Sequence, residues 1–345
     1  MSLSEQEAPR EPEPPKLRLL DRIRQRVLTK GYAQSTSDAY CYWAKRYILF
    51  HHKRHPSEMG SPQVGEFLSY LAEDEHVSSS TQNQALSALL FLYKEVLGAT
   101  LGKTLDTVRA KQYHHLPTVL SLDEVHRLFN QMSGTSKLMA ELTYGAGLRL
   151  MEIHQLRIGH LDFDARRVQV LDGKGRKDRL TLLPQGLIPS LQKHLAMVEA
   201  IHEDDLKRGL GNAVLPRAYY LKNKSASRQL RWQFVFPASG IFHDKKTGNS
   251  GRWHVQPKVL QKAVHDAADR ARIQKRVTIH ALRHSFATHL LQDGCDIRTI
   301  QTLLGHTNVN TTMLYAHIAD NHRLATRSPL DKLIGLKESA EPRDV

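Results

Sequence analysis

The sequence has few cysteines and no long apolar run. Cys41 and Cys295 lie far apart in the 345 residues and in no CxxC spacing, so neither a disulfide framework nor a thiolate zinc site is expected. Without an apolar stretch of about 20 residues, no membrane-spanning helix is expected either. Residues 1–16 are rich in Glu and Pro and lack the apolar region of a signal peptide, which predicts a disordered lead-in and a cytoplasmic protein.

Acidic residues are too few to balance the basic ones. Lys and Arg number 49 against 35 Asp and Glu, which gives a net charge of +14 at pH 7. Such a positive field attracts polyanions, and DNA is the commonest polyanion that a large basic protein meets. Because many basic proteins bind no nucleic acid, the charge alone favours a DNA partner without establishing one.

Residues 17–98 are predicted to form a helical domain. Four helices are expected, of which the second begins at Ser35 or Thr36, the third has Ser61 as its N-cap and the fourth ends at Gly98. Basic residues recur at helical spacing on the first two helices and are candidates for DNA contact: Arg22, Arg26, Lys30, Lys45 and Arg46. Charged helix faces are usually just solvated, but two basic rows on successive helices favour phosphate contact.

A linker over 99–118 is expected to lead to a second domain over 119–337 and a flexible tail over 338–345. The second domain opens with a capping box, Ser121 to Glu124. It continues with a β-hairpin over 168–184, which turns at the segment DGKG, and a long helix from Pro189 to Arg208. An irregular insertion at about 213–253 is expected to hold a short helix near 215–224 and a loop. The predicted fold class is therefore mainly α with a small antiparallel β-sheet.

Several familiar catalytic motifs are absent. The segment HALRH lacks the glutamate of a zinc HExxH motif, and neither a GxSxG elbow nor a GxxxxGK[ST] loop occurs. A metal site is therefore not expected, and no cofactor is called for. A tyrosine, two arginines, a lysine and two histidines remain as candidate catalytic residues: Arg149, Lys174, His280, Arg283, His306 and Tyr315.

Phosphodiester chemistry fits this residue set. Attack of a phenolate on a phosphodiester creates a highly charged pentavalent state, which fixed cations can neutralise without a metal. Arginine suits that task because its planar fork meets two phosphate oxygens and stays protonated. His280 and Arg283 are three residues apart on one predicted helix and so face the same side. Taken singly, His280 could equally be a core histidine, Tyr315 a buried aromatic and Lys174 a solubilising residue.

Taken together, these segments resemble the tyrosine recombinase (λ-integrase) superfamily. The matching segments are GLRLMEIHQLR, GKGRKDR, HALRHSFATHLL, LLGH and TTMLYAH, and the likeness extends over about 17–337. It implies a two-domain, C-shaped clamp in which Tyr315 forms a 3′-phosphotyrosine and Lys174 protonates the 5′-oxygen. It likewise implies that Arg149 and Arg283 hold the scissile phosphate, helped by His280 and His306, and that Glu152 buttresses Arg149.

The insertion, with the segments LPRAYYLKNK, RWQFVFPAS and GRWHVQPKVLQKAV, resembles that of integron integrases. This likeness implies a recombinase that integrates and excises gene cassettes at folded single-stranded attC sites and a duplex attI site, as a tetramer on two DNA sites. It also implies that Trp232 and His254 contact an extrahelical base, although Trp232 could instead be a core tryptophan. The alternatives are a Xer-like or phage-type recombinase on duplex sites, a type IB topoisomerase, and a non-catalytic DNA-binding module.

Overall fold

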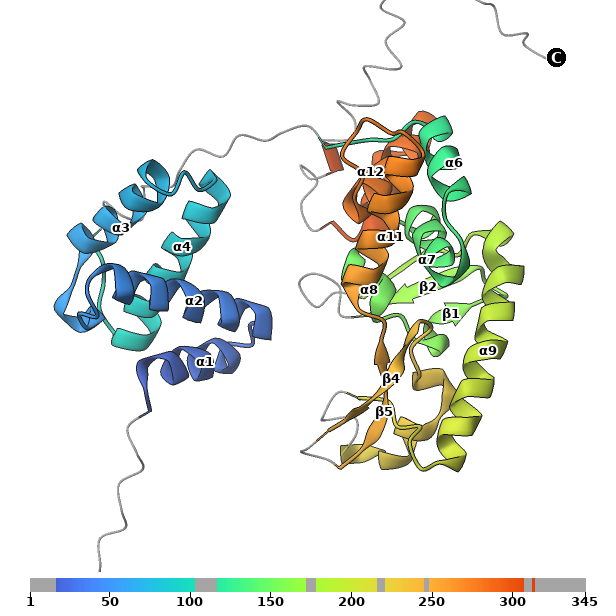
Figure 1. The fold of residues 1–345 in the computed structure, drawn as a ribbon, viewed down its shortest axis with the longest axis horizontal. Coiled ribbons are helices and arrows are strands. Elements are labelled where there is room, and N and C mark those ends of the chain that lie inside the picture. The colour runs from blue at the N-terminus through green and yellow to red at the C-terminus, as the bar shows by residue number, and fades with distance from the viewer. Residues whose placement is uncertain are drawn as a thin grey trace, which may run out of the picture. The chain divides into compact units, whose positions relative to one another are not determined.

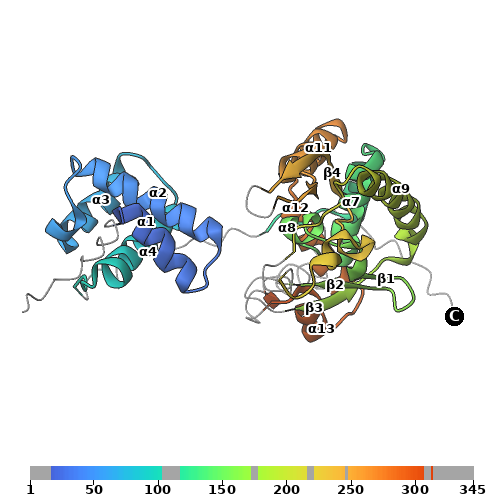
Figure 2. The same ribbon diagram turned by 90° about the horizontal axis from the view of Figure 1, so that it is seen from below.

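The computed structural model describes residues 17–102, 117–171, 178–215, 221–244, 248–306 and 312–313. The predicted lead-in, most of the linker, Lys174, Tyr315 and the tail lie outside these described residues. The chain divides into two compact units, Met1–His115 and Leu116–Val345, and this division falls within the predicted linker (Figures 1 and 2). The predicted clamp concerns the arrangement of the two units and stays a prediction.

The first unit is a set of helices around one apolar core. They are α1 (Leu19–Thr29), α2 (Gln34–Phe50), α3 (Ser61–Glu73) and α4 (Ser79–Phe91), and α4 continues as a π-helical segment over Leu92–Leu97. Inside the core the hydroxyl groups of Tyr47 and Tyr93 form a hydrogen bond of 2.9 Å. Gly98 ends the last segment with a φ of 69°, a left-handed conformation that glycine adopts without strain.

The four predicted helices are confirmed, with two corrections at their starts. Helix α2 begins at Gln34, slightly before the predicted position. Gly60, and not Ser61, is the N-cap of α3, because the amide of Gly60 donates to the side-chain oxygen of Gln63 over 2.9 Å.

The helices of the second unit surround a larger core. They are α6 (Leu122–Asn130), α7 (Gly134–Ala146), α8 (Leu150–His154), α9 (Ile188–Lys207), α11 (Pro257–Arg270), α12 (Ile279–Gln292) and α13 (Ile297–Leu304). The predicted capping box is confirmed, because the Ser121 amide donates to the Glu124 carboxylate and the Glu124 amide to the Ser121 hydroxyl. Of the helices in the described ranges, none has both the length and the apolar character needed to cross a membrane.

Two antiparallel sheets occur in the described part of the second unit. The first contains β1 (Leu161–Asp162), β2 (Arg167–Val170) and β3 (Arg179–Leu182), in that order, and confirms the predicted hairpin. The second pairs β4 (Pro237–His243) with β5 (Ser250–His254) in the insertion, where only a loop was expected. Between these strands Gly248 has a φ of 73°, and its amide donates to the Asp244 carbonyl. The loop prediction is therefore wrong over this stretch.

Strand β3 reverses the usual apolar-in, polar-out alternation. Leu180 and Leu182 are exposed, whereas Thr181 is buried and its hydroxyl donates to the carbonyl of Ala146 over 2.8 Å. Arg179 is two residues before Thr181 and therefore projects from the same, inward face of the sheet. This register directs an arginine side chain toward the interior of the unit.

The hairpin of β4 and β5 packs against the C-terminal end of α9 (Figure 1). Asp205, on α9, is 2% exposed and accepts two hydrogen bonds from the guanidinium of Arg252 on β5, over 2.6 and 3.0 Å. Gly251 lies so close to the backbone of Asn212 that a Cβ atom there would be 1.8 Å from the Asn212 carbonyl oxygen. Strand β5 is thus held against α9 and the segment that follows it.

The chain enters the second unit through a direct link to α12. Leu120 is fully buried, its amide donates to the hydroxyl of Ser285 over 2.9 Å, and its carbonyl oxygen lies 2.9 Å from Nε2 of His289. Both partners lie on α12, so the entering backbone and this helix are joined by two buried hydrogen bonds.

Candidate active site

Arg149 leaves a tight turn between α7 and α8. Gly147 is the C-cap of α7 and has a φ of 61°, and a Cβ atom there would lie 2.5 Å from the ring of Phe286. Arg149 is the N-cap of α8, and both its amide and its Nη1 donate to the carboxylate of Glu152 over 2.7 Å. Among the described residues no contact engages Nε or Nη2 of Arg149, so these donors are available to a phosphate.

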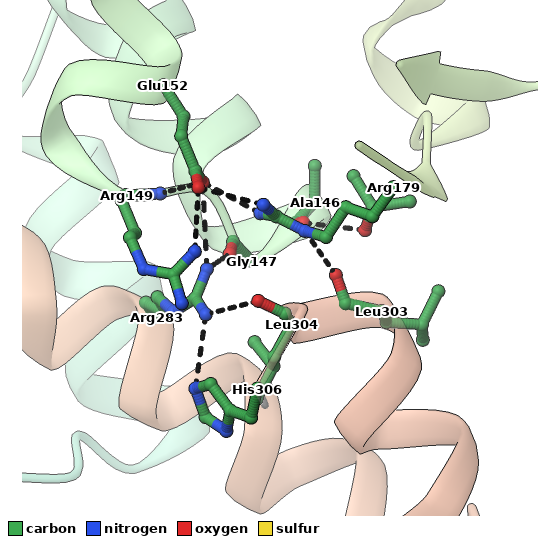
Figure 3. Close-up of polar contacts among 10 residues, drawn as sticks. Ala146, Gly147, Arg149, Glu152, Arg179, Arg283, Leu303, Leu304 and His306 are labelled. Carbon is green, nitrogen blue, oxygen red and sulfur yellow. Dashed lines mark hydrogen bonds and ion pairs between the residues drawn. The ribbon is translucent and has the colours of Figure 1, made fainter. Parts of the chain in front are cut away.

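Glu152 is the negatively charged centre of the site (Figure 3). Its carboxylate accepts from Arg149 and, over 2.7 and 2.8 Å, from both terminal nitrogens of Arg179, while Nη1 of Arg283 lies 3.7 Å away. Burial alone would raise the pKa of this carboxyl, but the hydrogen bonds and charge of Arg179, followed by the hydrogen bonds of Arg149, lower it to about 2. Glu152 is therefore ionised and buttresses Arg149, as predicted.

Arg283 joins the turn after α7 to the end of α13. Its side chain is almost fully buried on α12, and it donates to the carbonyl of Gly147 and, over 2.6 Å, to the carbonyl of Leu304. Its Nη2 also lies 3.2 Å from Nε2 of His306 (Figure 3). Two predicted site residues, which are far apart in the sequence, are thus in direct contact.

His306 follows Gly305, the left-handed C-cap of α13. Because Arg283 donates to Nε2, the proton of the imidazole is placed on Nδ1, which lies 3.0 Å from the hydroxyl of Thr312. Burial, followed by the charges of Arg283, Arg149 and Arg179, lowers the pKa of His306 to about 3. The free protein therefore holds this side chain as a neutral imidazole.

His280 lies one helical turn before Arg283 on α12. Partial desolvation, followed by the charges of Arg283 and Arg149, lowers the pKa of its imidazole. His280 and His306 thus both interact electrostatically with the guanidinium groups of Arg149 and Arg283. Four of the six predicted catalytic residues therefore lie at one site. Their catalytic roles stay predictions, and Lys174 and Tyr315 lie outside the described residues.

The sequence analysis missed Arg179. All three nitrogens of its guanidinium donate to protein acceptors, since Nε donates to the carbonyl of Leu303 over 2.8 Å and the other two bind Glu152. Arg179 and His306 also line a pocket of about 860 Å³ beside α13. In the sequence, an inward direction of Arg179 was indicated only by its position two residues before the small residue Thr181, which places both on the same face of the strand.

The predicted DNA-binding residues of the first unit are partly engaged in contacts within it. Arg26 and Lys30 form ion pairs with Glu95 at 3.2 and 2.6 Å, and Arg22 donates to the carbonyl of Val96 over 2.6 Å. Two further candidates lie on α2, where Arg46 pairs with Glu75 and Lys45 is exposed. Their contact with DNA stays a prediction.

The two candidates in the insertion lie in different surroundings. Trp232 lines a pocket of about 310 Å³ together with Phe234 and the exposed Trp253. His254 is 5% exposed, packs its ring against Phe234 and Trp253, and does not line that pocket. The neighbouring Trp253, which the sequence analysis did not select, lines the pocket in place of His254.

Over the described ranges, no group of three or more His, Cys, Asp or Glu side chains is placed to hold a metal ion. The cations near the candidate phosphate site are guanidinium groups.

Comparison with known proteins identifies the family. Residues 118–322 match the family described as "Phage integrase family". Residues 19–103 match the family described as "Phage integrase, N-terminal SAM-like domain". An "Integrase/recombinase" of Escherichia coli is 41% identical over 92% of this chain and 94% of its own length. A "Tyrosine recombinase" of Thermosipho africanus is 28% identical over 85% of this chain and 92% of its own.

The fold agrees with this assignment. A λ integrase dimer bound to a core site matches with a TM-score of 0.58 at 14% identity, and the match covers 90% of this chain and 97% of that one. The chain belongs to the phage integrase family. It is a tyrosine site-specific recombinase, an enzyme that binds and recombines DNA.

Proposed function

We propose that this recombinase is of the integron integrase type. It cuts and rejoins folded single-stranded attC sites and a duplex attI site, and so integrates and excises gene cassettes in the cytoplasm. Four protomers act on two DNA sites. Two features of the same unit support the proposal. One is the candidate phosphate site at Arg149, Arg283 and His306, and the other is an aromatic pocket lined by residues of the insertion.

In the proposed reaction the phenol of Tyr315 loses its proton to water, and the resulting phenolate oxygen attacks the scissile phosphorus. A bond from Tyr315 to phosphorus forms, the bond from phosphorus to the 5′-oxygen breaks, and a proton from Lys174 passes to that oxygen. Arg149 and Arg283 hold the non-bridging oxygens, with His280 and His306 as further hydrogen-bond donors. The neutral Nδ1–H tautomer of His306 gives Nε2 an acceptor role in the free protein, so donation to phosphate through Nε2 requires protonation or a tautomer change on binding.

The pocket beside Trp232 carries the integron part of the proposal. Its aromatic walls suit an unpaired base, which gains about 1–3 kcal/mol by stacking on such a surface. The guanidinium of Arg157 also lines the pocket, 4.5 Å from the centre of the Phe234 ring, and its Nη2 donates to the carbonyl of Val214 over 2.7 Å. Arg157 also donates to the carbonyl of Trp232 and forms no ion pair within the described residues, so its positive charge is not neutralised where it lines the pocket.

The test compares two suicide substrates of the same sequence, one a folded strand with extrahelical bases and the other a complete duplex, each nicked near the cleavage site. We expect the denaturation-resistant protein–DNA adduct to form about tenfold faster or more on the folded strand, the equivalent of one stacked base. Removal of the extrahelical bases, or Trp232→Ala, is expected to abolish this preference while cleavage of the duplex is retained.

The alternatives predict other results. Equal adduct formation on both substrates, unchanged by Trp232→Ala, would favour a Xer-like or phage-type enzyme on duplex sites. Relaxation of a supercoiled plasmid by protein too dilute to assemble would favour a type IB topoisomerase.

A further inference from the structure

Arg179 connects three elements of the active site. It projects from β3, the strand that follows the hairpin turn bearing Lys174 in the sequence. Its terminal nitrogens grip Glu152 on α8, and its Nε donates to the carbonyl of Leu303 near the end of α13 (Figure 3). Each of these elements leads directly to a residue of the proposed phosphate site.

The fit around Arg179 is tight. Its side chain is 6% exposed, and a Cβ atom on Gly305 would lie 2.7 Å from its Cδ. The stem of Arg179 therefore packs against the residue that precedes His306, and the glycine at that position permits both this approach and the left-handed turn. A shift of Arg179 would displace both Glu152 and the start of the His306 segment.

The hydrogen bonds separate Arg179 from Arg149, whose guanidinium keeps two nitrogens without a hydrogen bond or ion pair among the described residues. Arg149 uses only Nη1 of its side chain within the described residues, whereas every guanidinium nitrogen of Arg179 already donates to the protein. By binding both oxygens of Glu152, Arg179 also fixes the orientation of the carboxylate that holds Arg149. With all three nitrogens bound to Glu152 and Leu303, the guanidinium of Arg179 orients these neighbours.

We propose that Arg179 is a positioning residue for DNA cleavage, which sets Arg149 through Glu152 and His306 through the end of α13. This inference rests on the roles proposed for Arg149 and His306. It does not depend on whether the DNA site is folded or duplex, because every comparison is made on a site that the unmodified enzyme cleaves.

The main test is Arg179→Met, which keeps a long apolar stem but removes the charge and the donors. We expect it to bind DNA within about threefold of the unmodified protein, while adduct formation slows by about 100-fold, the effect of misplacing reacting groups by about 1 Å. Arg167→Met is the matched control, because Arg167 lies on the neighbouring strand β2 and is exposed. Adduct formation by Arg179→Met within about threefold of that control would overturn the proposal.

A double-variant cycle asks whether Arg179 acts through Glu152. Because Glu152→Gln removes the carboxylate that Arg179 holds, we expect Arg179→Met to slow the Glu152→Gln enzyme by less than about tenfold. Multiplication of the two single effects would show that Arg179 acts independently of Glu152 and would overturn that part of the proposal.

The pH profile gives a readout that a loss of stability alone would not produce. Glu152 faces Arg149, Arg179 and Arg283; His280 interacts with it electrostatically, and His306 contacts Arg283. Without Arg179 the pKa of Glu152 should rise, so adduct formation by Arg179→Met should fall at mildly acidic pH. The Arg179→Met and Glu152→Gln double variant should lack this acidic fall, since Gln does not titrate. A fall that persists in the double variant would contradict the proposal.

Arg179→Lys covers the case in which Arg179→Met fails to fold. Lysine keeps the charge but cannot make the two-pronged contact with Glu152 and the bond to Leu303 together. We expect an intermediate loss of about tenfold in the rate of adduct formation with DNA binding retained. A lysine variant that matches the unmodified enzyme in rate and pH profile would overturn the proposal.

Discussion

At the scale of single residues, the proposed chemistry depends on one phenol oxygen. Tyr315→Phe removes that oxygen and little else, so we expect DNA binding to stay within about twofold while no covalent adduct forms. The measurement is a denaturing gel of the protein with a labelled, nicked site, and Tyr32→Phe, at a half-exposed position in the first unit, serves as control. Recovery of a protein–DNA phosphodiester from Tyr315→Phe would remove Tyr315 from its role.

The residues that converge at Glu152 were predictable to different degrees. Four of the residues could be selected without coordinates, because they lie in sequence segments that resemble the motifs of the recombinase family: Arg149, His280, Arg283 and His306. Arg179 could not be selected, because a basic residue on a hairpin strand most often faces solvent. Its inward direction depends on the pairing of Val168 with Thr181, which exposes the leucines on both sides of Thr181. That register is a property of two strands and not of either alone.

At the scale of secondary-structure elements, the ion pair between Asp205 and Arg252 should hold the insertion hairpin. We expect Asp205→Asn to lower the free energy of unfolding by about 3 kcal/mol, because it leaves the guanidinium of Arg252 without its buried partner. Urea denaturation measures this loss. Asp204→Asn is the matched control, since the pair of Asp204 with Arg208 is exposed and contributes about 1 kcal/mol or less. Equal losses in the two variants would refute the anchoring role.

The helices were predictable because residues close in the sequence determine where they begin and end. Examples are the capping box of Ser121 with Glu124 and the C-cap Gly98. The hairpin of β4 and β5 was not predictable in this way. Its position is fixed by contacts between residues distant in the sequence, namely Arg252 with Asp205 and Gly251 with the Asn212 backbone. No periodic pattern in the insertion encodes these contacts, so a loop was the expected reading.

At the scale of the whole molecule, buried histidines should make stability depend on pH. Burial and neighbouring positive charges lower the pKa of His160 and His284 to about 4 and that of His306 to about 3. The unfolded chain therefore binds more protons than the folded one below pH about 6.5, and the free energy of unfolding should fall as the pH drops toward about 4. Each proton contributes a slope of about 1.4 kcal/mol per pH unit.

Chemical denaturation between pH 7 and pH 5 measures this slope. We expect His284→Asn to reduce the slope by about one proton, because that histidine no longer titrates on unfolding. His265→Asn, at an exposed position on α11, should leave it unchanged. A slope that His284→Asn does not alter would contradict the assignment of this titration to His284.

The backbone at Leu120 gives the catalytic unit a mechanical connection to its own leading segment. Tension along the chain that precedes Leu120 would be delivered, through Ser285 and His289, to the helix that bears His280 and Arg283. A pull on that segment would therefore reach the helix that holds the proposed phosphate contacts His280 and Arg283 through two buried hydrogen bonds.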